Sequence, residues 1–217
     1  MKIDCTGVIL AGGVNKRLPG IHKGFREIGG KRVVDFVFDV YQEIFNEIIV
    51  VTNQPEEYRA YDAKIVTDII QIRSSLAGIH SGLFHATHPL IFVSACDTPF
   101  LKKDLVLKII ESFESGIDIV IPQTFKGLEP LCAVYHKKCF EPIETVLKEE
   151  KLIIKEFILK SRTKFLGEEE IVALDPELQS FFNINTPEDW KRSEEILKQK
   201  NSNSTQLISK IQNCGLI

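Results

Sequence analysis

The sequence predicts a doubly wound α/β fold with a mostly parallel sheet, and three observations lead to this prediction. Short β-branched runs alternate along the chain with segments of helical periodicity. Several of these runs are almost continuously apolar, as strands buried on both faces of a parallel sheet must be. No fixed-period repeat or low-complexity block interrupts residues 1–198. This alternation favours βαβ units with right-handed crossovers.

The elements follow one another in a regular order. The expected strands are residues 7–10, 47–52, 64–67, 90–95, 117–121, 131–135 and 181–184. The expected helices are residues 33–45, 76–87, 103–115, 139–147, 153–161 and 187–198. Ligands of such sheets bind at the carboxyl ends of the strands, where the strand order reverses. We therefore expect the site in the loops after Leu10, Thr52, Thr67 and Ala95.

The composition is that of an ordinary globular protein of 217 residues, 44% hydrophobic and 26% charged, which excludes a wholly disordered chain. Its 27 basic and 30 acidic residues give a net charge of −3, too little field to hold nucleic acid or an anionic membrane across a broad face. A bound anion must therefore be held by a local cluster. We expect one domain over residues 1–198, and a polar linker with a short helix or tail over residues 199–217.

Several features predict a soluble cytoplasmic protein. No apolar run approaches the roughly 18 residues of a membrane span, and the first residues lack the apolar core of a secretory signal. The five cysteines form no Cys-x-x-Cys pair, which favours reduced thiols over disulfides or a zinc site.

A glycine turn carries the strongest chemical signal. An apolar run ends in Gly12 and Gly13, and the cations Lys16, Arg17 and Lys23 follow within eleven residues. Glycines let backbone amides approach a phosphate closely, and the cations neutralise its charge. The segment has neither the P-loop spacing nor the Gly-x-Gly-x-x-Gly spacing of a dinucleotide-binding oxidoreductase. It predicts a phosphate-binding turn of another kind.

Polar side chains follow three further strands. Asp97 ends a buried run and precedes Pro99, so it is placed to hold Mg²⁺ against phosphates. Asp68 and Asn53 follow two other strands, and an amide such as Asn53 can reach a base or a ribose.

A last motif precedes the final helix. Thr186, Pro187 and Asp189 fit its N-cap, its first position and a capping-box acid. That structural role does not account for Asn183 and Asn185, which are therefore candidate site residues.

Together these segments resemble the molybdenum cofactor guanylyltransferase (MobA) family of the nucleotidyltransferase superfamily. The resemblance covers roughly residues 5–198, and the motifs occur in the order of the family. They are Leu10-Ala11-Gly12-Gly13 with Arg17 and Lys23, Gly29-Gly30-Lys31, Leu76-Ala77-Gly78-Ile79, Cys96-Asp97-Thr98-Pro99-Phe100, Glu129-Pro130-Leu131-Cys132-Ala133-Val134-Tyr135 and Asn183-Ile184-Asn185-Thr186-Pro187-Glu188-Asp189. The sequence departs from the family at His22, where an acid is usual, and at Ser74-Ser75, where Gly-Pro is typical.

The resemblance implies a Rossmann-like sheet of the nucleotide-diphospho-sugar transferase type and a role for each matched residue. Leu10, Ala11, Gly12 and Gly13 would wrap the nucleotide. Arg17 and Lys23 would bind the triphosphate and serve catalysis together with Asp97. Asp68 would lie at the guanosine end, and Asn53, which matches the family approximately, would also bind the nucleotide. Asp97 would ligate Mg²⁺. Asn183 and Asn185 would border the acceptor.

The implied reaction is transfer of GMP from GTP to the phosphate of molybdopterin, with release of pyrophosphate, by a monomer or weak homo-oligomer. An acceptor phosphate is already anionic, so orientation and charge stabilisation suffice for catalysis. Two alternatives remain open. One is a cytidylyltransferase or sugar-phosphate nucleotidyltransferase of the same superfamily, and the other is a nucleotide-binding regulatory protein without catalysis.

Overall fold

An eight-stranded sheet forms the centre of the computed structural model, which describes residues 3–12 and 23–213, with only the backbone of Lys23 and of residues 201–213. The strands are β1 (Thr6–Leu10), β4 (Ile48–Val51), β5 (Lys64–Val66), β6 (Leu90–Ala95), β7 (Ile119–Thr124), β8 (Gly127–Leu128), β9 (Cys132–His136) and β10 (Thr163–Leu166). Their order is β10-β7-β9-β6-β1-β4-β5, with β8 paired to β7. A separate hairpin joins β2 (Glu27–Ile28) to β3 (Lys31–Arg32).

The sheet is mostly parallel, as predicted. Strand β1 pairs in parallel with both β4 and β6, β4 with β5, and β7 with β10. Strand β9 is antiparallel to β6 and β7, and β8 is antiparallel to β7. The chain proceeds outward from β1 through β4 to β5 and then returns to the other side of β1 at β6. The strand order therefore reverses between β1 and β6, which is where a doubly wound sheet binds its ligand.

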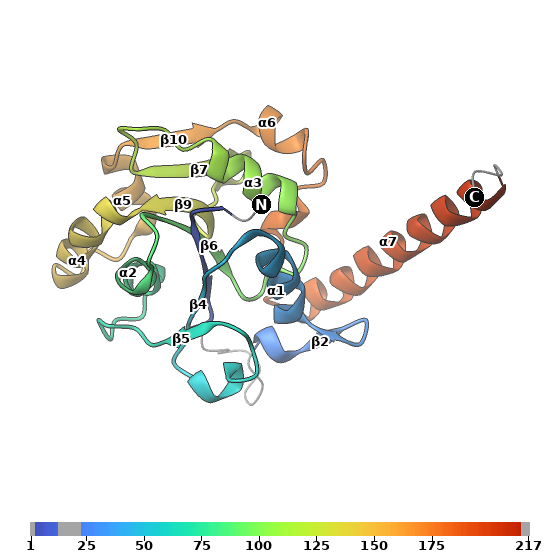
Figure 1. Cartoon of the computed structure of the whole chain (residues 1–217), viewed down its shortest axis with the longest axis horizontal. Coiled ribbons are helices and arrows are strands. Elements are labelled where there is room, and N and C mark those ends of the chain that lie inside the picture. Colours follow the sequence, from blue (N-terminus) through green and yellow to red (C-terminus); the bar gives the residue numbers. More distant parts are fainter. Residues whose placement is uncertain (1–2, 13–22, 214–217) are drawn as a thin grey trace.

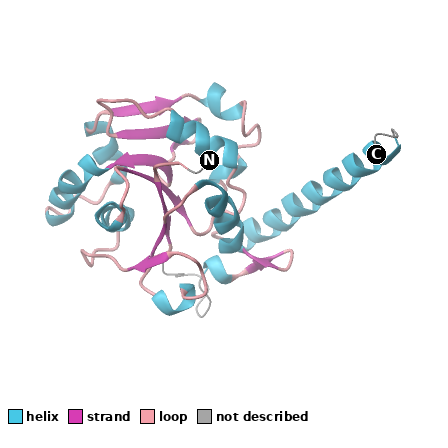
Figure 2. Ribbon diagram, in the orientation of Figure 1, coloured by secondary structure: helices cyan, strands magenta, loops and turns pink. Residues whose placement is uncertain are grey.

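Helices cover both faces of the sheet (Figures 1 and 2). Side chains alternate across a strand, so Ile9 packs with α1 (Val33–Ile44), α3 (Lys103–Glu111) and α6 (Glu168–Val172) on one face. Val8 packs with α2 (Ser75–His85), α4 (Phe140–Lys148) and α5 (Ile154–Lys160) on the other. The single-turn helices are η1 (Lys23–Phe25), η2 (Pro55–Tyr58), η3 (Lys137–Cys139) and η4 (Gln179–Phe181).

One strand prediction was wrong, and one strand was not predicted. Residues 181–184 form no strand, because η4 runs into them and Ile184 donates its amide hydrogen to the carbonyl of Asp97 at 3.0 Å. The side chains of Phe182 and Ile184 pack in a small cluster of the loops and the last helix, while Phe181 packs against the main core. Strand β10 was not predicted, since an edge strand of four residues with only one buried side chain carries little apolar pattern.

The last helix, α7 (Pro187–Asn213), is continuous through residues 201–205, so the prediction of a polar linker there was wrong. Neither proline nor glycine occurs between residues 188 and 213, and serine or asparagine costs a helix only a few tenths of a kcal/mol each. The predicted cap is present: Asp189 donates its amide hydrogen to the Thr186 hydroxyl at 3.1 Å. The division of the chain at residue 198 stays a prediction.

A third apolar cluster holds the start of α7 to the body, while its far end projects away from the sheet (Figure 1). Ile196 and Trp190 of α7 pack there with Ile28 of the hairpin and with Phe100 and Ile184. The loop after β6 and the last helix therefore share one core.

The described cysteines, Cys5, Cys96, Cys132 and Cys139, are all buried thiols. Across the described parts of the chain, none of the helices is both long enough and apolar enough to span a membrane.

At the edge of the sheet opposite the carboxyl ends of β1 and β6, Glu47 joins three segments. Its carboxylate accepts hydrogen bonds from the hydroxyl of Thr6 and from both the amide and the hydroxyl of Thr87, the last two at 2.9 Å. Nδ1 of His88 lies 3.5 Å from Oε2 of Glu47. Burial opposes ionisation of Glu47, but these hydrogen bonds outweigh it and lower the pKa of the carboxyl.

We expect Glu47→Gln to reduce the free energy of unfolding at pH 7 by about 1–3 kcal/mol, since charge-assisted hydrogen bonds are lost. The folded-state pKa lies below the ordinary value of 4.5, so the stabilisation is complete above pH 4.5 and is lost as the pH falls through the folded-state value. Urea denaturation from pH 7 down to pH 3 measures this. Glu43→Gln is the control, because Glu43 forms only an exposed ion pair with Lys103. A Glu47 effect that stays constant over this range would contradict the prediction.

Candidate functional site

The register of the sheet aligns the ends of four strands. Leu10 of β1 pairs with Val51 of β4 and with Ala95 of β6, and Val51 pairs with Val66 of β5. Neighbouring strands lie about 4.8 Å apart, so these residues form one row across the sheet. The residues two positions beyond this row are Gly12, Asn53, Asp68 and Asp97. The four candidates therefore leave the sheet at one level, on both sides of the point where the strand order reverses.

The pairing continues just past β1 and shapes the glycine turn. Ala11 donates its amide hydrogen to Val51 at 2.8 Å, and its carbonyl accepts the Thr52 hydroxyl at 3.3 Å. At the exposed Gly12, a Cβ atom would lie 3.7 Å from Asn53 Nδ2 and 3.9 Å from Asp68 Oδ2. The backbone of the turn thus runs against the Asn53–Asp68 pair, as the sequence predicted for one site. Gly13, Lys16 and Arg17 lie outside the described residues.

Asn53 and Asp68 contact each other directly, with Nδ2 of Asn53 donating to Oδ2 of Asp68 at 3.3 Å. Burial raises the pKa of Asp68, and the hydrogen bond from Asn53 moderates that increase. Both side chains come from loops at the carboxyl ends of adjacent strands. Asp68 is a half-buried acceptor suited to N–H or O–H groups of a ligand rather than to a phosphate.

Helix α2 packs closely on the end of β1. The Ser74 hydroxyl caps the helix by accepting the Leu76 amide hydrogen at 3.2 Å. A Cβ atom at Gly78 would lie 3.0 Å from Cδ2 of Leu10, so only glycine fits there without displacing that side chain. The glycine of the Leu-Ala-Gly-Ile motif therefore fixes the position of Leu10, a residue predicted to wrap the nucleotide.

Asp97 follows β6 on the other side of the reversal point and is half-buried. The hydroxyl of Thr98 donates to Ala95 at 2.8 Å, which tightens the turn. A Cβ atom at Gly24 would lie 3.5 Å from Sγ of Cys96, so η1 packs on the residue before Asp97. Because η1 begins at Lys23, the backbone of that predicted catalytic residue comes close to the Asp97 turn.

The chemistry of the carboxylates suits one class of metal site. Among the described residues, no three His, Cys, Asp or Glu side chains gather into a metal site. Mg²⁺ is commonly bound by one or two carboxylates, with substrate phosphates and water completing its shell. Asp97 therefore fits a Mg²⁺ ion that arrives with phosphates better than an ion held by protein ligands alone.

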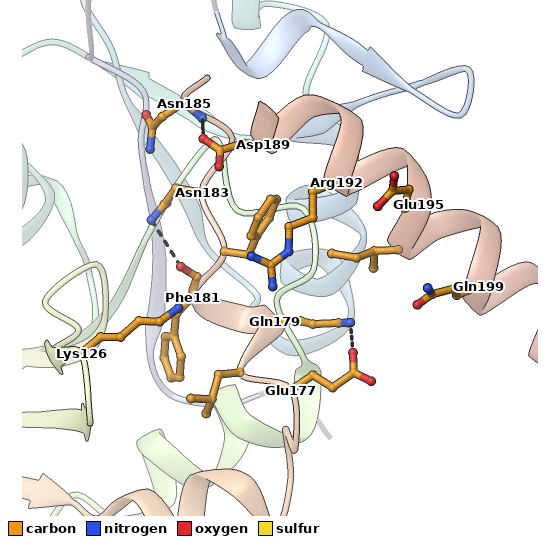
Figure 3. A pocket seen from close by; sticks show the side chains of 13 residues that line it. Lys126, Glu177, Gln179, Phe181, Asn183, Asn185, Asp189, Arg192, Glu195 and Gln199 are labelled. Atoms are coloured by element: carbon orange, nitrogen blue, oxygen red, sulfur yellow. Dashed lines mark hydrogen bonds between the residues drawn. The ribbon is translucent and has the colours of Figure 1, made fainter. Parts of the chain in front are cut away.

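A cavity of about 450 Å³ lies beyond Asp97, between α7, the segment before it and the turn that joins β7 to β8 (Figure 3). Asn183 and Asn185 line it and flank Ile184, whose amide hydrogen bonds the carbonyl of Asp97. The two asparagines predicted to border an acceptor are thus tied to the predicted metal ligand. The polar and charged side chains of the other walls are Lys126, Glu177, Gln179, Asp189, Arg192, Glu195 and Gln199.

Sequence reasoning missed the two cations of this cavity, Lys126 and Arg192. Lys126 lies in a short turn and Arg192 lies on the first half of an amphipathic helix, and both positions commonly carry solvated charges. No local sequence pattern distinguishes these two residues from ordinary surface cations. Their proximity depends on how α7 packs against the third apolar cluster, which requires the tertiary structure.

Comparison with known proteins gives a consistent result. The family of MobA-like NTP transferase domains matches residues 7–164. A molybdenum cofactor guanylyltransferase of Desulfosudis oleivorans is 42% identical over 193 residues, 89% of this chain and 96% of that protein. A probable molybdenum cofactor guanylyltransferase of Natranaerobius thermophilus is 36% identical, covering 91% of this chain and 98% of that protein.

The chain is also similar to a solved structure. Molybdopterin-guanine dinucleotide biosynthesis protein A of Archaeoglobus fulgidus superposes with a TM-score of 0.79 at 30% identity. The match covers 89% of this chain and 99% of that one.

We expect Asn53→Ala to raise the pKa of Asp68 further, because the variant removes the hydrogen bond that favours the ionised carboxyl. An NMR titration of the aspartate side-chain carbons would measure this shift. Gln54→Ala is the control, since Gln54 is exposed and its side chain forms no hydrogen bond with the described residues. If the Asp68 pKa is the same in the wild type and in Asn53→Ala, the proposed contact is wrong.

Proposed function

The chain belongs to the MobA-like NTP transferase family, and we propose that it transfers GMP from GTP to the phosphate of molybdopterin, forming the guanine dinucleotide cofactor and pyrophosphate. The names of the two relatives and of the solved structure support this reaction. The observation that carries the proposal is the row of Gly12, Asn53, Asp68 and Asp97 at the point where the strand order reverses, with a cavity beyond Asp97.

The two sides of the row would hold different parts of the nucleotide. Leu10, Ala11, Gly12 and Gly13 would wrap GTP, with backbone amides turned toward it. Asn53 and Asp68 would take the guanosine end, because a carboxylate and a side-chain amide match the N–H and O–H groups found there. The triphosphate would then extend toward Lys23, Arg17 and Asp97. Asn183 and Asn185 would border the acceptor.

We also propose that Asp97 holds Mg²⁺. When bound, the ion would offset the negative charge of the phosphates. The donor set supports this, since a single carboxylate beside a phosphate-binding turn is a common Mg²⁺ arrangement. Arg17 and Lys23 would contribute positive charge from the same side.

The chemical step needs little from the protein beyond positioning. An oxygen of the acceptor phosphate bonds to the α-phosphorus of GTP, and the bond to the bridging oxygen breaks so that its electron pair leaves with pyrophosphate. The attacking oxygen is already anionic, so no general base must remove a proton. The contribution of the chain is to hold the two phosphates in line and to stabilise the charge between them.

The net charge of −3 bears on the class of partner, and we propose that the chain binds small molecules rather than nucleic acid or a membrane. We also propose that it acts in the cytoplasm, as a monomer or weak homo-oligomer.

Pyrophosphate release tests the proposal. With Mg²⁺ and molybdopterin, we expect release from GTP but not from CTP, ATP or UTP, and none without the acceptor. Asp97→Asn should reduce kcat by about 100-fold or more, as loss of a group that organises charge at the reacting phosphates does. Asp104→Asn is the control, because Asp104 is an exposed aspartate at the start of α3.

Three results would contradict the proposal. Release from CTP would identify a cytidylyltransferase, and full activity of a folded Asp97→Asn variant would remove the assigned role of Asp97. Tight nucleotide binding without release under any of these conditions would favour a regulatory protein.

A further inference from the structure

We propose that Arg192 and Phe182 form a stacking platform for the flat heterocycle of the acceptor, and that Arg192 determines the affinity for that ring. The inference rests on the proposed function for the identity of the ring as a pterin. The platform itself is supported by the position of Arg192, by its unused hydrogen-bond donors and by the rigidity of the wall beneath it.

The guanidinium of Arg192 lies over an aromatic face. Its Cζ atom is 5.4 Å from the centre of the Phe182 ring, and both residues line the cavity. Figure 3 shows Arg192 reaching from α7 toward the cavity. Among the described residues, Arg192 forms no hydrogen bond and no ion pair, although arginine carries five N–H donors. One face of the guanidinium is therefore covered by Phe182, and its other face is available to a planar ligand.

The neighbouring carboxylate of Asp189 forms no ion pair with Arg192. Asp189 also lines the cavity, but its carboxylate accepts the amide hydrogens of Asn185 and Thr186 at 3.0 and 2.9 Å. Its pKa is lowered by these hydrogen bonds, against the effect of burial, with a smaller contribution from Arg192. Asp189 thus serves the helix cap and leaves the guanidinium to a ligand.

The wall beneath the platform is rigid. Phe182 packs on Phe100, three residues after Asp97, with 5.9 Å between ring centres. The preceding segment is anchored by the fully buried Asp175, which accepts the Ser180 amide hydrogen at 2.7 Å and pairs with Lys102 at 3.0 Å. A platform held in this way is preorganised, so little conformational entropy is lost when a ring binds.

The rim of the cavity matches the edge of a pterin. A pterin is a flat ring system that carries adjacent N–H donors and a carbonyl acceptor. Gln179 already donates one amide hydrogen to Glu177, which orients the two side chains. The carboxylate of Glu195 and the second oxygen of Glu177 can accept from such donors, and Gln199 and the second amide hydrogen of Gln179 can donate to the carbonyl. The ring would lie in the cavity while the phosphate of the same molecule reaches toward Asp97, to which the cavity is joined through Ile184.

Fluorescence titration with neopterin, a fluorescent pterin, tests the platform without any turnover. We expect Arg192→Ala to weaken neopterin binding about tenfold, the size of a lost stacking contact. Arg192→Lys should weaken it similarly, because lysine retains the charge but has no planar face. Lys191→Ala is the matched control, since Lys191 is the exposed neighbouring cation and does not line the cavity. Circular dichroism would verify that each variant is folded.

Kinetics of pyrophosphate release provide the second measurement. In Arg192→Ala we expect the KM for molybdopterin to rise about tenfold while the KM for GTP changes less than twofold, since the platform contacts only the acceptor. If Arg192→Lys behaves like the wild type in both measurements, the role of Arg192 is its charge and the platform is wrong. If Arg192→Ala leaves both measurements unchanged, the inference fails entirely.

The two proposals can fail separately. Arg192-dependent neopterin binding without any release of pyrophosphate from GTP would support the platform and overturn the proposed reaction. Conversely, pyrophosphate release from GTP could depend on molybdopterin while the KM for molybdopterin is the same in the wild type and in Arg192→Ala. That result would support the reaction and overturn the platform.

Discussion

The site depends on one constraint, the parallel pairing that places Leu10, Val51, Val66 and Ala95 in a single row. Each of the four candidate residues stands two positions beyond this row, so the backbone hydrogen bonds of the sheet fix the points from which their loops begin. A slip of one residue in any strand would move its candidate by about 3.3 Å and exchange the buried faces of that strand. The two apolar layers that cover the sheet oppose such a slip, and the core therefore maintains the geometry of the site.

A second consequence of the fold is that the two halves of the proposed reaction share one support. Asp97 is joined to the cavity by the amide of Ile184, and Phe100 of the same loop packs with Phe182 and with the start of α7. The edge proposed to bind the nucleotide and the cavity proposed to bind the acceptor thus belong to one packed unit. For a reaction between two phosphates, fixed relative placement of the reactants supplies much of the rate enhancement. The rigid connection has a direct catalytic use in the proposed mechanism.

The parts that the sequence predicted are those whose signal is local. The central strands are apolar runs, and Asn53, Asp68 and Asp97 directly follow three of them, so the topology rule alone brought these residues together. Residues 181–184 look like a strand by composition, but Phe182 and Ile184 pack in a cluster with α7. The polar residues 201–205 look like a linker, yet nothing in them stops a helix. Arg192 and Lys126 could not be predicted, because they reach the same cavity only through packing between elements that are distant in sequence.

The position of Asp68 bears on the direction in which the proposed nucleotide would lie. Asp68 stands beyond β5 at one end of the row, where its carboxylate would repel a triphosphate. At the other end, η1 packs against Cys96, so the chain that carries Lys23 approaches the Asp97 turn. In the proposed function the nucleoside would lie on the β4–β5 side, and the triphosphate on the β1–β6 side, where a Mg²⁺ ion on Asp97 would offset its charge. The α-phosphate would then lie on the side of the cavity, which is where an acceptor phosphate must arrive.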